Sequence, residues 1–164
     1  MPDAFRLISE YFWLACLAVT WFNARRAGNA LDRFAELSDD QRQEAKGIVR
    51  RFALLATLPW LIVGAGQILG STPSIWAYFR PQDGNPFVIA WLALVTLLNC
   101  ALSGWLLLGG GARKVVDLKL AQALGKRHRK PPAVWLVKAY AVGVLAVVPL
   151  WIWGVIAMNA PIPR

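Results

Sequence analysis

The chain has 164 residues, of which 57% are hydrophobic and 16% are charged, and 18 Lys and Arg against 9 Asp and Glu give a net charge of +9. A soluble domain has about 25% charged residues, and a chain this short could not bury so much apolar surface in one water-facing core. The aromatic content, 12%, also excludes a disordered chain. The composition predicts a single integral membrane domain, residues 1–164.

The first candidate membrane span is residues 5–22, an apolar and aromatic stretch with Glu10 near one end. A membrane-crossing helix needs about 20 mostly apolar residues, and a carboxylate near its end can reach the headgroup region. We therefore predict a span here, with a buried amphipathic helix as the alternative. The segment lacks the basic start and the small-residue cleavage site of a secretory signal, which favours an uncleaved anchor.

Three further spans are predicted from long stretches without charge. No Asp, Glu, Lys or Arg occurs in residues 52–79, 84–112 or 139–163. Each stretch is long enough for one membrane-crossing helix. We place the crossings at residues 52–70, 87–108 and 133–157. Together with the first span they predict an all-α fold, a four-helix transmembrane bundle.

Two basic loops, residues 23–51 and 109–132, each carry seven Lys and Arg. The other side of the membrane receives only Arg6, Arg80 and Arg164. Because Lys and Arg concentrate in cytoplasmic loops, this bias predicts that both termini face away from the cytoplasm. The location that we expect is the cytoplasmic, or inner, membrane of a bacterium.

The first basic loop has the features of a helix start. Ser38 and Gln41 have the spacing of a capping box, and Asp39 and Asp40 suit the positive end of the helix dipole. We predict a helix that runs without a break from this cap into the second span. In the second basic loop, three glycines at 109–111 indicate a hinge after the third span. The bundle should therefore carry helical cytoplasmic extensions.

The sequence has no motif that is typical of a cofactor site or a catalytic site. Cys16 and Cys100 are isolated on different spans, and His128 is the sole histidine, so we predict neither a metal nor another cofactor. Among the carboxylates, Glu10 alone lies inside a predicted span, which argues against an enzyme. Acidic residues interleave with the basic ones in the first loop, so we predict no nucleic-acid binding.

Polar side chains inside the predicted spans form the candidate intramembrane site. They are Glu10, Gln67, Thr96, Asn99 and Ser103. Glu10 has two interpretations, an interfacial pair with Arg6 four residues earlier or a proton- or cation-coupled site. Asn99 also has two interpretations: it forms a hydrogen bond between helices, or it lines a polar pathway.

The basic residues next to the spans are expected to contact lipid, including anionic headgroups. The candidates are Arg25, Arg26, Arg50, Arg51, Arg113, Lys114 and Lys138. Other membrane proteins, or further copies of this chain, are the remaining expected partners. The sequence favours a non-enzymatic accessory or interaction subunit of a membrane complex. The alternative is a small homo-oligomeric transporter or channel whose polar pathway is lined by the third helix.

An internal repeat is a further hypothesis. Pro59 and Gly64 in the second span have the same separation as Pro149 and Gly154 in the fourth. Parallel repeats of this kind occur in transporters, but proline and glycine are common in membrane helices in any case. The two helical hairpins are either true repeats or similar by coincidence.

Overall fold

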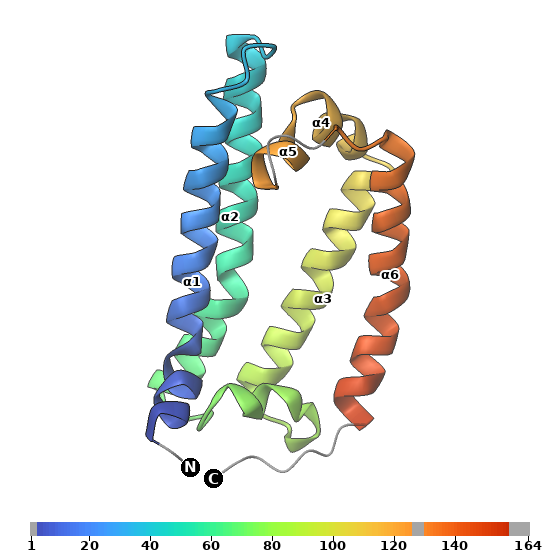
Figure 1. Cartoon of the computed structure of the whole chain (residues 1–164). Helices are drawn as coiled ribbons and strands as arrows, with labels where there is room; N and C mark the ends of the chain where they lie inside the picture. Colours follow the sequence, from blue (N-terminus) through green and yellow to red (C-terminus); the bar gives the residue numbers. More distant parts are fainter. Residues whose placement is uncertain (1–2, 126–129, 158–164) are drawn as a thin grey trace.

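The computed structural model describes the backbone of residues 3–125 and 130–157, with side chains from residue 8 onward. Four long helices are α1 (Asp3–Leu31), α2 (Asp39–Ile68), α3 (Pro86–Leu107) and α6 (Val134–Ala157) (Figure 1). The short helices are α4 (Gly111–Asp117), α5 (Leu120–Leu124) and the 3₁₀ turns η1 (Ile75–Phe79) and η2 (Pro81–Asp83). The described residues form helices joined by turns, with no strand among them, which confirms the all-α part of the predicted fold class.

Three helices of the described chain, α2, α3 and α6, are long and apolar enough to cross a membrane. They cover the second, third and fourth predicted spans and support an integral membrane protein. Helix α1 is 29 residues long but is not among the three. The fourth crossing, the closed bundle and the orientation therefore remain predictions.

Helix α2 begins at the predicted capping box. The Ser38 hydroxyl accepts a hydrogen bond from the Gln41 amide at 3.2 Å, and the Gln41 side-chain oxygen accepts one from the Ser38 amide at 3.0 Å. The helix then continues for 30 residues. At 1.5 Å per residue it is about 45 Å long, which exceeds the ~30 Å hydrocarbon core. Its first turns must project beyond the apolar layer, as predicted for a helical extension.

The hinge after α3 depends on glycine. Gly110 has a φ of 71°, a left-handed conformation that glycine adopts without strain. A side chain at Gly111 would overlap the ring of Trp105, so this position also requires the close approach that glycine allows. The chain therefore turns between α3 and α4 at the glycines where a hinge is predicted. At the far end of this loop, α6 begins at Val134, after the proline pair at 131–132.

The long helices pack chiefly against their neighbours in the order α1, α2, α3, α6. Figure 1 shows α2 and α3 close together near η1 and separating toward α4 and α5. The two basic loops lie at that same end, which we call the basic end. Pro59 is buried in α2 whereas Pro149 is exposed on α6, and the repeat hypothesis stays untested.

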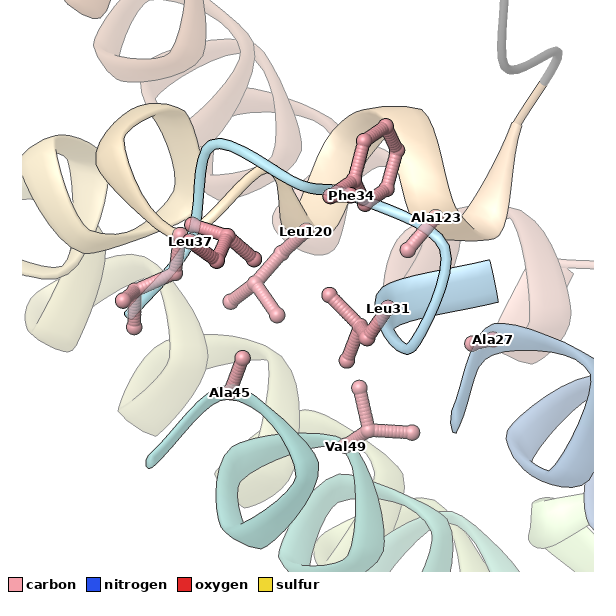
Figure 2. Close-up of a cluster of buried hydrophobic side chains, with 9 residues drawn as sticks. Ala27, Leu31, Phe34, Leu37, Ala45, Val49, Leu120 and Ala123 are labelled. Carbon is pink, nitrogen blue, oxygen red and sulfur yellow. The ribbon is translucent and has the colours of Figure 1, made fainter. Parts of the chain in front are cut away.

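A small hydrophobic core, the basic-end core, joins the loops at the basic end (Figure 2). Its buried members are Ala27, Leu31, Phe34, Leu37, Ala45, Val49, Leu118, Leu120 and Ala123. They come from α1, the α1–α2 turn, α2 and the α4–α5 segment. The α4–α5 segment is therefore packed against the side of the first hairpin, chiefly through contacts of α5 with α1.

A second hydrophobic cluster lies at the opposite end, under η1. Tyr78 is fully buried there; its hydroxyl donates to the Ile62 carbonyl at 3.2 Å, and its ring packs edge-on against Trp91 at 5.6 Å. Trp91 in turn packs against Trp151 of α6 at 5.9 Å. Burial raises the pKa of the Tyr78 phenol, so the hydroxyl keeps its proton and remains a donor. This aromatic cluster links α2, η1, α3 and α6.

Candidate functional site

The predicted intramembrane polar residues fall into two groups rather than one site. Thr96, Asn99 and Ser103 share a face of α3, because residues three and four apart are neighbours on a helix. Glu10 and Gln67 lie on α1 and α2, away from the basic end. The structure does not bring the five side chains together.

Gln67 connects α2 to α1. Its amide nitrogen donates to the Ser9 carbonyl at 3.3 Å, while its amide oxygen is buried with no hydrogen-bond partner among the described residues. Glu10 follows Ser9 and is half-buried. The predicted pairing of Glu10 with Arg6 is not tested, because the Arg6 side chain lies outside the described part of the chain.

Asn99 is bonded within its own helix. Its amide nitrogen donates to the Val95 carbonyl at 2.8 Å, so this bond does not join two helices as one interpretation expected. Within the described residues, the Thr96 hydroxyl is buried without a hydrogen-bond partner. Ser103 is 1% exposed. Thr96, Asn99 and Ser103 give α3 a polar stripe. Of the three, Asn99 lines two grooves on the surface of the chain.

Two apolar grooves flank α3. The α2–α3 groove has a volume of about 390 Å³ and is lined mainly by Phe52, Leu55, Leu98, Leu102 and Trp105, with Asn99 and Arg51. The α3–α6 groove has a volume of about 480 Å³ and includes Val95, Asn99, Tyr140, Gly143, Val147 and Trp151. Both volumes lie in the range of about 300–1,000 Å³ that is usual for small-molecule sites.

A polar pocket of about 410 Å³ adjoins the α2–α3 groove at its basic end. Ile48, Arg51 and Trp105 line both cavities. The polar pocket adds Glu44 and Lys114, whose carboxylate and ammonium groups form an ion pair at 2.5 Å. The apolar groove and the charged pocket therefore adjoin at Arg51. The sequence of neither loop alone could predict this arrangement.

The basic residues expected to contact lipid are all exposed. Arg25 and Arg26 lie on α1, Arg50 and Arg51 on α2, Arg113 and Lys114 on α4, and Lys138 on α6. Lys114 is paired with Glu44, which the sequence did not indicate. This placement is compatible with headgroup contact, which stays a prediction.

Several acidic residues of the first basic loop form ion pairs. Lys46 pairs with Asp32 at 2.6 Å, and Arg42 pairs with Asp39 at 2.5 Å. Lys119 of the second loop pairs with Glu36 of the first. Exposed pairs of this kind contribute about 0–1 kcal/mol each, so their main effect is to lower the local positive charge.

No protein-family model, curated protein or solved structure matches the chain. Within the described residues, no three His, Cys, Asp or Glu side chains are grouped as a metal site would require. His128, the sequence's single histidine, lies outside those residues. The grooves beside α3 and the polar pocket are the candidate binding features of the described part of the chain.

Proposed function

We propose that the chain is a non-enzymatic accessory subunit of a membrane complex, with four spans in a bacterial cytoplasmic membrane and its basic end in the cytoplasm. The charge bias of the loops supports this orientation. The separated positions of the polar side chains support a role in binding rather than catalysis. The partner is a transmembrane helix of a different membrane protein.

The exposed face of α6 carries this proposal. Ala139, Gly143 and Ala146 are exposed along it, and a Cβ added at Gly143 would meet no atom within 4 Å. Small residues concentrate where membrane helices approach each other closely, yet here they are exposed on the chain's surface, with Gly143 in the lining of the α3–α6 groove. Tyr140, 69% exposed beside Gly143, supplies an aromatic contact with a hydroxyl. A helix seated in the α3–α6 groove would contact Gly143 and Tyr140 directly.

Gly143→Leu should abolish co-purification of the partner, because the leucine side chain would fill the place where the partner's backbone approaches. Gly154→Leu is the matched control, since Gly154 is also a glycine of α6 with open space at its Cβ but does not line the groove. The measurement is the intact mass of complexes extracted in mild detergent. Partner retention by Gly143→Leu, or equal loss in both variants, would contradict the proposed interface.

A homo-oligomeric transporter or channel is the second candidate. The buried Thr96 hydroxyl, unpartnered within the described chain, and the position of Asn99 at both grooves favour it, because a polar stripe on α3 would line a pathway if copies of the chain met there. The same intact-mass measurement separates the candidates. A complex of identical chains supports the transporter, and a complex with a different chain supports the accessory role.

The proposed orientation predicts a labelling pattern in intact cells. In a background without Cys16 and Cys100, a cysteine at Gln82 should react with an impermeant thiol reagent, and one at Gln43 should not. Both glutamines are exposed, so exposure does not distinguish them. Permeabilised cells provide the control, because both positions should then react. The reverse pattern in intact cells would refute the orientation.

A further inference from the structure

Arg51 occupies the junction between the apolar α2–α3 groove and the polar pocket. Its side chain is exposed and forms no hydrogen bond or ion pair with another residue of the described chain. Trp105 lines both cavities opposite it and packs against Phe52 with ring centroids 5.3 Å apart. An aromatic ring and a free cation at one level of a membrane protein are typical of the headgroup boundary.

On the membrane side of Arg51, the α2–α3 groove is lined mostly by apolar side chains. Ala56 lies five residues further along α2, and Leu98 lies seven residues from Trp105 along α3. At 1.5 Å per residue, the lining extends about 7–10 Å into the apolar layer. A hydrocarbon chain entering from the membrane could replace its lipid neighbours there with apolar side chains.

The pocket on the other side of Arg51 contains charges of both signs. Glu44 and Lys114 are paired, and Asp40, which forms no ion pair with another residue that the structure describes, lies further from the groove. Among the described residues that line the two cavities, Arg51 is therefore the unpaired cation, and the carboxylates lie beyond it. This order matches a zwitterionic phospholipid headgroup, with its phosphate nearest the acyl chains and its ammonium group outermost.

We propose that the α2–α3 groove and the polar pocket bind one phospholipid with an ethanolamine headgroup. One acyl chain lies along Phe52, Leu55 and Leu102, and the phosphate accepts hydrogen bonds from the Arg51 guanidinium. The ammonium group points toward Asp40, the carboxylate of the pocket that is not held by Lys114. The site requires insertion of α2 and α3 in a membrane, but it does not depend on the accessory role.

Native mass spectrometry of the full chain in detergent, with added lipid, tests the site. Phosphatidylethanolamine should bind about tenfold more tightly than diacylglycerol, which lacks the whole phosphoethanolamine headgroup, and more tightly than phosphatidylglycerol, which keeps the phosphate but lacks the ammonium group. Equal binding of all three would reduce the groove to a non-selective apolar surface and overturn the proposal. Tighter binding of phosphatidylglycerol would overturn the assigned headgroup.

Arg51→Gln should weaken binding of phosphatidylethanolamine about tenfold, because an amide cannot replace the charged guanidinium. Arg50→Gln is the matched control: it removes the same charge from the adjacent residue, which is exposed but lines neither cavity. An equal effect of both variants would show that general positive charge, not this site, attracts the lipid.

A second pair of variants tests the acyl-chain part of the site. Ala56→Trp should fill the groove and reduce lipid binding, while Ala93→Trp, at an exposed alanine of α3 outside the groove, should not. Circular dichroism and the elution volume in detergent identify variants that have failed to fold. If a folded Ala56→Trp protein binds the lipid as the wild type does, the groove is not where the acyl chain lies.

Discussion

Replacing Gly66 by alanine is expected to destabilise the protein by about 1–3 kcal/mol, although alanine usually favours a helix over glycine. A Cβ at this position would overlap the hydroxyl of Tyr78 and lie 2.9 Å from the Thr72 hydroxyl. Tyr78 cannot move away easily, because it is fully buried and its hydroxyl is bonded to the Ile62 carbonyl. The alanine would therefore separate η1 from α2.

The measurement is the thermal unfolding midpoint in detergent, compared with that of Gly104→Ala. Gly104 is a helical glycine of α3, and a Cβ added there would meet no atom within 4 Å, so this control should be neutral or stabilising by up to about 1 kcal/mol. Adding Tyr78→Phe to Gly66→Ala removes the overlapping oxygen and should restore part of the lost stability. If Gly66→Ala changes the unfolding midpoint no more than Gly104→Ala does, η1 does not lie as close to α2 as the structure places it.

The elements of this fold that local chemistry specifies were predictable from the sequence. The Ser38 cap, the unbroken helix that follows it and the glycine hinge at 109–111 each depend on residues close together in the chain. The burial of Tyr78 was not predictable. It depends on contacts with Trp91 and with the Ile62 carbonyl, both distant in sequence, and no periodic pattern in the loop indicates them.

The candidate sites show the same division. The sequence correctly marked Asn99 as a polar residue of an apolar helix, but its hydrogen bond to the Val95 carbonyl within α3 is one of several that an asparagine there could form. Arg51 was one of several basic residues next to a span, equivalent in the sequence to Arg50. Only the packing of α3 and α4 beside α2 shows that Arg51 lines two adjoining cavities and that Arg50 lines neither.

Leu31→Ala should destabilise the basic end by about 2–5 kcal/mol, the usual cost of removing a buried leucine side chain. Leu31 has no exposed surface and belongs to the basic-end core that holds α5 against α1 and α2 (Figure 2). Leu54→Ala is the control, since Leu54 is 47% exposed on α2 and belongs to neither hydrophobic core. Hydrogen exchange of the backbone amides measures the effect residue by residue.

The pattern of exchange distinguishes local loosening from general unfolding. In Leu31→Ala, amides of α5 and the α1–α2 turn should exchange faster, because their packing depends on the same buried side chains, while amides near Tyr78 at the opposite end should not change. A uniform increase would mean that the two cores unfold together. The expected local increase would mean that the basic-end core unfolds independently of the hydrophobic cluster at the opposite end.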